Sequence, residues 1–119
     1  MPAQVYPFVI NKVMTNKPSV VPYKDINLDV FAEVRNAANS VVVDVREGWE
    51  FEEFNLGGVN IPMGEVHSRV GELSNFQTIF VICANGSRSK VAAHFYGRTP
   101  ILANSTVFHL KGGILEADQ

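Results

Sequence analysis

Cysteine is almost absent from this sequence, since Cys83 is the only one among 119 residues. An intramolecular disulfide needs two cysteines, so the sequence excludes the disulfide frameworks of many small secreted domains. The three histidines, His67, His94 and His109, lie far apart and lack the paired spacing of zinc ligands. We therefore expect no bound metal, and we expect each histidine to face solvent.

Long hydrophobic runs are also lacking. The apolar stretch at residues 5–10 is interrupted by Pro7, which makes it too short for a membrane span or a signal peptide. We therefore expect a cytoplasmic protein with no membrane partner. Residues 1–20 show no clear hydrophobic period and are predicted to form an N-terminal extension. A single domain is predicted over residues 21–119, a length sufficient for one hydrophobic core.

Charge of one sign is not in excess, because the formal net charge is only −2 and charged residues make up 18% of the chain. Proteins that bind nucleic acid usually carry a clear positive excess on at least one face. The composition therefore predicts no nucleic-acid partner. Apolar residues account for 46% of the chain, which is typical of a globular domain.

The single cysteine lies between a predicted strand and a predicted helix. Residues 78–82 form an unbroken apolar run rich in β-branched residues, as in a strand buried on both faces of a parallel sheet. The apolar residues that follow have helical spacing: Val91, Ala92, Phe95 and Tyr96. Gly97 is predicted to end that helix. Cys83 is thus predicted at the carboxyl end of a strand, in the loop that opens a helix.

This position has chemical consequences for the thiol. A helix N-terminus presents unpaired N–H groups and a partial positive charge, so a thiol placed there ionises more easily. Asn85 and Gly86 can adopt left-handed backbone angles, which lets the loop curl into an anion-binding cup, and Arg88 adds a permanent cation. The alternative is a small, inert core cysteine. The glycine, the arginine and the helix start favour the reactive interpretation.

Four segments carry a resemblance to a known family. Residues 83–89, Cys-Ala-Asn-Gly-Ser-Arg-Ser, resemble the active-site loop of the rhodanese family in the spacing of cysteine, glycine, arginine and serine. Residues 44–51, 54–62 and 110–114 resemble three further segments of that family. The resemblance extends over residues 23–114.

The resemblance implies an α/β fold, namely a three-layer α/β/α domain with a central five-stranded parallel sheet in the order 3-2-4-5-1. Cys83 would then end the central fourth strand, where open α/β sheets bind their ligands. The predicted strands are residues 23–26, 41–45, 59–61, 78–82 and 107–110. Two helical stripes are expected in the core. The first contains Val30, Phe31, Val34, Ala37 and Ala38 after an N-cap at Asn27 or Asp29, and the second contains Val66, Val70 and Leu73.

The resemblance also implies a sulfurtransferase with no cofactor. The Cys83 thiolate would take sulfur from a small donor or a persulfidated protein, carry it as a persulfide, and pass it to a thiol or to cyanide. Six loop residues are then expected to bind the anionic sulfur: Ala84, Asn85, Gly86, Ser87, Arg88 and Ser89. Asp44 and Arg46 are expected to stabilise the active-site end of the sheet without binding the sulfur themselves.

Two other classes of function use parts of the same pattern. A phosphatase or arsenate reductase would employ a Cys–Arg cup, but phosphatase loops place five residues between cysteine and arginine, and this chain has four. A non-catalytic rhodanese-homology module would bind a partner and would need neither residue.

Ala84 stands where many family members carry arginine, which disfavours thiosulfate as the donor. Four nearby acidic residues are predicted to form a solvated helical face: Glu47, Glu50, Glu52 and Glu53.

Overall fold

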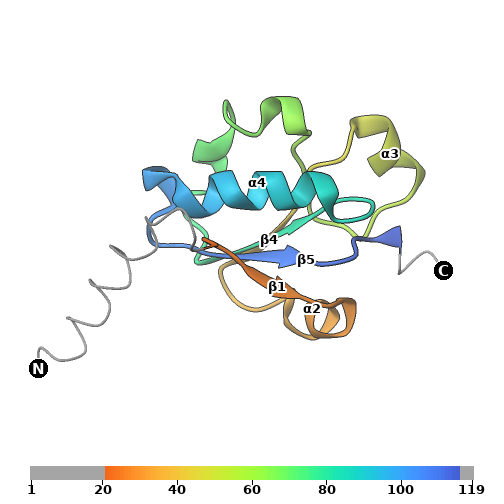
Figure 1. Cartoon of the computed structure of the whole chain (residues 1–119), viewed down its shortest axis with the longest axis horizontal. Helices are drawn as coiled ribbons and strands as arrows, with labels where there is room; N and C mark the ends of the chain where they lie inside the picture. The colour runs from red at the N-terminus through yellow and green to blue at the C-terminus, as the bar shows by residue number, and fades with distance from the viewer. Residues whose placement is uncertain (1–20, 116–119) are drawn as a thin grey trace, which may run out of the picture.

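A five-stranded parallel sheet forms the centre of the protein (Figure 1). The computed structural model describes residues 21–115, so the predicted extension at residues 1–20 lies outside the described residues. In these residues the strands are β1 (Lys24–Ile26), β2 (Ser40–Asp44), β3 (Val59–Asn60), β4 (Thr78–Ile82) and β5 (Thr106–Leu110). Their order is β1-β5-β4-β2-β3, with every pairing parallel. The predicted fold class and strand order are confirmed.

Helices cover both faces of this sheet. The described residues contain α2 (Leu28–Val34), α3 (Gly48–Glu53) and α4 (Ser87–Arg98). Short 3-10 turns lie at Met63–Glu65, Val70–Leu73 and Pro100–Leu102. Figure 1 places α4 on one side of the sheet and α2 on the other, which gives the three layers. Within residues 21–115, no helix is long and apolar enough to cross a membrane.

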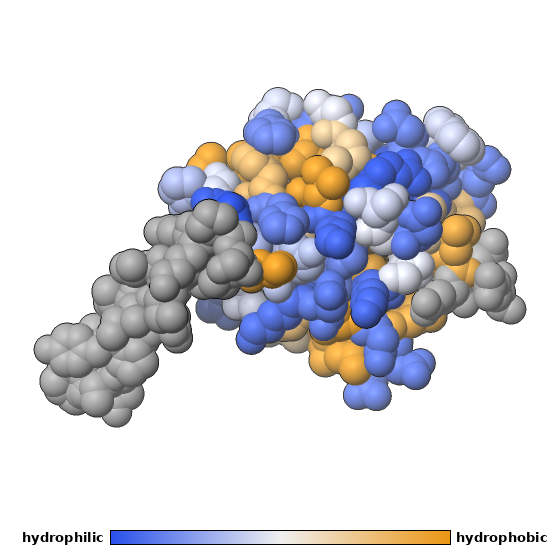
Figure 2. Space-filling view, in the orientation of Figure 1, coloured by the Kyte–Doolittle hydropathy of each residue, from blue (hydrophilic) through white to orange (hydrophobic). Residues whose placement is uncertain are grey.

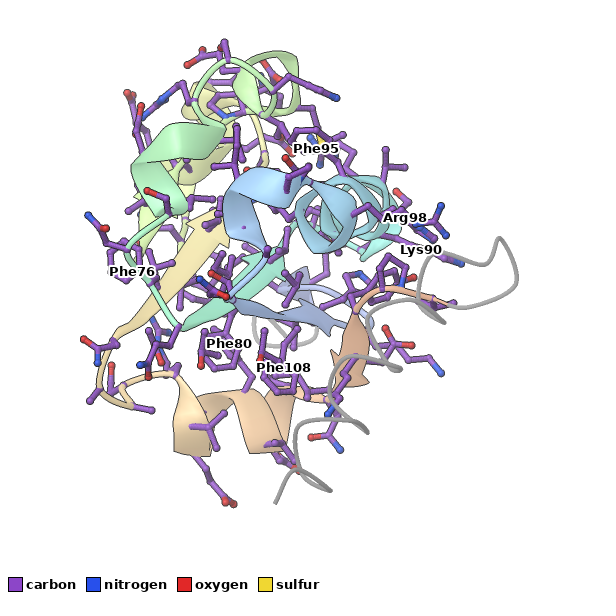
Figure 3. All side chains as sticks on the ribbon, turned by 90° about the vertical axis from the view of Figure 1, so that its left-hand side faces the viewer. Phe76, Phe80, Lys90, Phe95, Arg98 and Phe108 are labelled. Carbon is purple, nitrogen blue, oxygen red and sulfur yellow. The ribbon has the colours of Figure 1, made fainter. Side chains whose placement is uncertain are left out.

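The central strand β4 is buried on both faces, which explains its unbroken apolar sequence. Ile79 and Val81 pack in the core on the α4 side. Phe80 packs in the core on the α2 side, with an edge-on contact to Phe31. Figure 3 shows Phe80 and its stacked neighbour Phe108 directed toward α2, with Phe95 on the opposite side of the sheet. The alternation continues into Cys83, which belongs to the α4-side core.

The first predicted helical stripe is largely wrong. Asn27 caps α2 as expected, because its side-chain oxygen accepts from the Val30 N–H at 2.9 Å. The helix has only seven residues, so a single position, Phe31, is fully buried, whereas Val30 and Val34 are exposed. The helix ends at Val34, so the predicted stripe positions Ala37 and Ala38 follow it and are also exposed.

The predicted end of the helix after the cysteine is wrong as well. The helix α4 continues through Gly97 to Arg98. The glycine serves packing instead, because a Cβ atom at Gly97 would lie only 2.2 Å from the Pro22 carbonyl oxygen. Gly97 therefore allows the chain before β1 to cross closely over α4.

The second predicted stripe is buried, but it is not one α-helix. Val66, Val70 and Leu73 lie in the core on the α4 side. They are carried by short turns in which Ser68 and Ser74 donate to carbonyl oxygens three residues earlier, at 3.2 and 3.0 Å. Such local side-chain bonds compete with a continuous α-helix.

Candidate active site

Cys83 lies directly after β4, at the carboxyl edge of the sheet. Its side chain is fully buried. Two backbone N–H groups point at the sulfur: Gly86 N lies 3.1 Å from Sγ and Ser89 N lies 3.2 Å from it. Convergent N–H groups of this kind form an anion-binding nest, so the site favours a negatively charged sulfur.

The shape of the loop depends on Gly86 and Asn85. Gly86 has φ +95° and immediately precedes the first residue of α4, a conformation that favours glycine. The Asn85 side-chain oxygen accepts from both Ser87 N at 3.0 Å and Ser87 Oγ at 2.8 Å. These contacts fix the turn so that the first N–H groups of α4 face Cys83.

The chain after β5 holds the other side of the loop. Ile114 N donates to the Cys83 carbonyl oxygen and Leu115 N to that of Ala84, both at 2.9 Å. Gly113 allows this contact, because it has φ +74° and an added Cβ would lie 2.3 Å from the Ala84 carbonyl oxygen. Gly113 thus has a steric function at the loop.

Arg88 is bound by Glu50 from α3. The two guanidinium nitrogens lie 2.6 and 3.0 Å from the two carboxylate oxygens. These hydrogen bonds are the main reason why the pKa of Glu50 is lowered to about 2. The pKa of Arg88 is raised chiefly by the same bonds, with a smaller contribution from the negative charge of Glu50.

The prediction of a solvated acidic face therefore fails at Glu50. Its side chain is only 16% exposed, because the helix turns this position toward the cysteine loop. Glu47, Glu52 and Glu53 are exposed as expected. Sequence spacing could not reveal the exception, since 38 residues separate Glu50 from Arg88.

Asp44 and Arg46 form a buried ion pair at the end of β2. Arg46 donates to Asp44 Oδ1 at 3.0 Å and to Oδ2 at 2.8 Å. The same guanidinium donates to the backbone oxygens of Glu50 at 3.3 Å and Phe54 at 2.6 Å. The pair therefore holds the middle and the C-terminal end of α3, the helix that presents Glu50 to Arg88.

The family follows from a direct comparison. Residues 27–118 match the sequence model of the rhodanese-like domain. The chain belongs to the rhodanese-like domain family. The resemblance noted from the cysteine loop is thereby confirmed.

Three known proteins show what this rhodanese-like domain resembles. It is 39% identical over 71 residues to the "Putative sulfur carrier protein YrkF" of Bacillus subtilis, covering 58% of this chain and 38% of that protein. A rhodanese-related protein from Thermoplasma volcanium is 29% identical, covering 79% of this chain and 89% of that one, with a TM-score of 0.66. An NAD-dependent persulfide reductase from A. fulgidus is 27% identical, covering 90% of this chain and 18% of that one, with a TM-score of 0.56. The chain therefore spans well under two thirds of the length of the curated relative and of the reductase.

His109 of the rhodanese-like domain is the main residue that sequence reasoning missed. It is buried on β5, contrary to the prediction of a solvated histidine. Its Nδ1 lies 2.8 Å from Asp25 Oδ1, and its Nε2 lies 2.9 Å from Ser89 Oγ. The available signal was strand alternation, because Val107 and His109 share one face of β5 and Val107 lies in the core.

The other two histidines differ from each other. His67 is exposed, as predicted. His94 is half-buried and packs against the ring of Tyr23, with ring centroids 5.1 Å apart. Among residues 21–115, no group of three or more histidine, cysteine or acidic side chains is arranged to hold a metal ion.

An open hollow of about 190 Å³ lies beside the cysteine loop of this rhodanese-like domain. Its lining combines apolar, acidic and basic side chains with part of the loop: Arg46, Trp49, Glu50, Glu53, Phe54, Ala84, Ile114 and Leu115. Trp49 and Leu115 are strongly exposed, at 66% and 48%. The face seen in Figure 2 is mainly hydrophilic, with apolar residues in separate small groups.

Proposed function

We propose that this rhodanese-like domain is a sulfurtransferase in which Cys83 carries the sulfur. The observation that carries the proposal is the pair of N–H groups, from Gly86 and Ser89, at 3.1 and 3.2 Å from the buried sulfur. Such donors stabilise an anion without reorganising, so they suit both a thiolate and a persulfide at this position. Family membership and the sulfur-related name of the Bacillus subtilis relative support the same assignment.

The proposed reaction has two displacements at sulfur. The Cys83 thiolate attacks the outer sulfur of a donor, R–S–SH, and a bond forms between the two sulfurs. The donor's own S–S bond breaks, R–S⁻ leaves and takes up the proton, and Cys83 retains the outer sulfur as a persulfide anion. An acceptor thiolate or cyanide then attacks the terminal sulfur, and the Cys83 thiolate is the leaving group.

The donor that fits the site best is a persulfidated protein thiol or a polysulfide. Thiosulfate carries two negative charges and needs a free cation at the point of approach. Ala84 supplies none, and both nearby arginines are paired, Arg46 with Asp44 and Arg88 with Glu50. The hollow beside Ala84 is lined by apolar and acidic side chains and by Arg46, which Asp44 already binds, and this lining suits a less charged donor.

A non-catalytic partner-binding domain is the second candidate, favoured by the burial of Cys83. The residue is 0% exposed, so a donor reaches the sulfur only when part of the loop moves aside. Arg88 is already neutralised by Glu50, as in a domain that has no anion to bind. In that case Cys83 would be an inert core residue.

Intact mass spectrometry distinguishes these two functions. The protein is treated separately with thiosulfate, inorganic polysulfide and the persulfide of a small thiol, then with cyanide. We expect polysulfide and the persulfide to add the mass of one sulfur atom, and cyanide to remove it. The matched control is Cys83→Ser, which keeps nearly the same volume and should add nothing. If the folded protein gains no sulfur from any donor, the partner-binding function is correct.

A further inference from the structure

His109 is a buried titratable side chain that the proposed reaction does not use directly. It lies on β5 between Asp25 of β1 and Val81 of β4, in the register of the parallel sheet. One ring nitrogen, Nδ1, contacts the Asp25 carboxylate at 2.8 Å. The other, Nε2, lies 2.9 Å from Ser89 Oγ and 3.0 Å from the Gly86 carbonyl oxygen.

The two residues at Nε2 are the same two that bind the sulfur. Gly86 places its carbonyl oxygen at His109 and its N–H at Cys83 Sγ. Ser89 places its hydroxyl at His109 and its N–H at the same sulfur. A single imidazole nitrogen therefore holds both N–H donors of the thiol, one before the helix start and one in its first turn.

Three polar groups surround the His109 ring. The Asp25 carboxylate and the Gly86 carbonyl oxygen are hydrogen-bond acceptors, whereas Ser89 Oγ can donate or accept, so both ring nitrogens have a hydrogen-bond partner. The other titratable groups around it are Tyr23, whose ring packs edge-on at 5.5 Å, and Cys83, reached through Gly86 and Ser89. Asp25 is half exposed and lies on the outer side of this chain of contacts.

We propose that His109, oriented by Asp25, is the positioning residue that keeps the Gly86 and Ser89 N–H groups directed at Cys83. The inference rests on the proposed function in one respect: it takes the anion held by the two N–H groups to be the Cys83 thiolate or persulfide of the reaction cycle. His109 does not touch the donor or the sulfur. It acts by holding the loop. Its loss should therefore destabilise the thiolate form of Cys83 more than it destabilises the folded protein.

The first test replaces the ring while leaving an apolar side chain in the core. In His109→Leu, the pH midpoint of Cys83 alkylation by iodoacetamide should rise by about one pH unit, because the hydrogen bonds that fix the two donors are lost. The matched control is His94→Leu, since His94 also packs on Tyr23 but lies half-buried on α4, five residues beyond Ser89. The control midpoint should equal that of the wild type.

Two milder variants keep the proposal testable if His109→Leu does not fold. His109→Gln retains an N–H donor near the position of Nε2 and should recover part of the shift. Asp25→Asn alters a half-exposed side chain and should raise the midpoint by a smaller amount. Its control is Asp29→Asn, which removes the same charge from the exposed surface of α2. Thermal unfolding of every variant is measured alongside.

The readouts separate this inference from the proposed function. Alkylation needs no sulfur donor, so a raised midpoint supports the positioning role even if the wild type accepts no sulfur. If the wild type loads sulfur and the folded His109 and Asp25 variants keep the midpoints of their controls, the inference is overturned while the proposed function stands. A fall in melting temperature with an unchanged midpoint would likewise overturn it, because His109 would then serve packing alone.

Discussion

Arg88 at the start of α4 binds both carboxylate oxygens of Glu50 in α3, at 2.6 and 3.0 Å. This bidentate pair joins the cysteine loop to the segment anchored by Asp44 and Arg46. It also removes the one arginine of the loop from contact with an incoming anion. Stability and the charge balance beside Cys83 therefore depend on the same guanidinium, and the two effects can be measured separately.

The stability conferred by the pair should depend on pH. In the folded protein the pKa of Glu50 is about 2, below its ordinary 4.5, so the folded state binds a proton less readily than the unfolded state. The contribution is complete above about pH 4.5 and is lost as the pH falls through 4.5 toward 2. Glu50→Gln should cost about 1 kcal/mol at pH 7.

Urea unfolding at pH 7, 4 and 3 checks this prediction. The difference between the wild type and Glu50→Gln should shrink as the pH falls. The matched control is Glu72→Gln, which breaks an exposed carboxylate pair with Arg69 on the surface. That control should change stability much less than Glu50→Gln does at pH 7, because solvent screens an exposed pair. An equal cost for Glu50→Gln at pH 7 and pH 3 would show that the effect is not electrostatic.

Arg88→Ala should reduce sulfur transfer more than stability. The substitution removes a cation near Cys83 and leaves the Glu50 carboxylate unbalanced, which disfavours an anionic sulfur. A loss of ~1.5–3 kcal/mol corresponds to roughly 10- to 100-fold in kcat/KM. Arg69→Ala, which removes an exposed arginine with two carboxylate partners, is the control and should transfer sulfur normally. Normal kcat/KM in a folded Arg88→Ala variant would make Arg88 a structural residue.

The sequence predicted the elements that depend on local pattern. The apolar run at residues 78–82 predicted a strand buried on both faces, and β4 is such a strand. The same run therefore predicted correctly that Cys83 lies at the carboxyl edge of the sheet. The cap at Asn27 also depends on a contact only three residues along the chain. The length of α2 was missed, because helical spacing continues past the residue at which the helix ends.

Contacts between distant segments could not be predicted in the same way. His109 and Asp25 are 84 residues apart, and they meet only because β1 and β5 are neighbours in register. The resemblance implied that strand order but assigned no function to a histidine on β5. Gly97 was predicted to end a helix because glycine is common at helix C-termini. Its close contact with Pro22, which explains the glycine, cannot be seen without the fold.

Ala84→Arg should increase the use of thiosulfate. Ala84 lines the open hollow beside the loop, so an arginine there adds a cation next to Cys83 in addition to the paired Arg46 and Arg88. The gain should appear in kcat/KM and decrease as salt concentration rises, because exposed charges are screened. Val91→Arg adds the same charge at an exposed position of α4 outside this lining and should have no effect. An unchanged kcat/KM at low salt would mean that donors do not approach past Ala84.

Gly113→Ala should disturb the cysteine loop from the side of the C-terminal segment. Gly113 has φ +74°, and its added Cβ would lie 2.3 Å from the Ala84 carbonyl oxygen, a backbone atom that can yield only if the loop moves. We expect a loss of ~1–3 kcal/mol in stability. Iodoacetamide should also alkylate Cys83 faster at high pH, because the displaced loop no longer encloses the sulfur. Gly71→Ala is the control, since a Cβ there meets nothing within 4 Å and its stability should change by less than ~1 kcal/mol. If Gly113→Ala matches Gly71→Ala in both measurements, the segment after β5 does not hold the loop, and the burial of Cys83 must come from α4 and α3 alone.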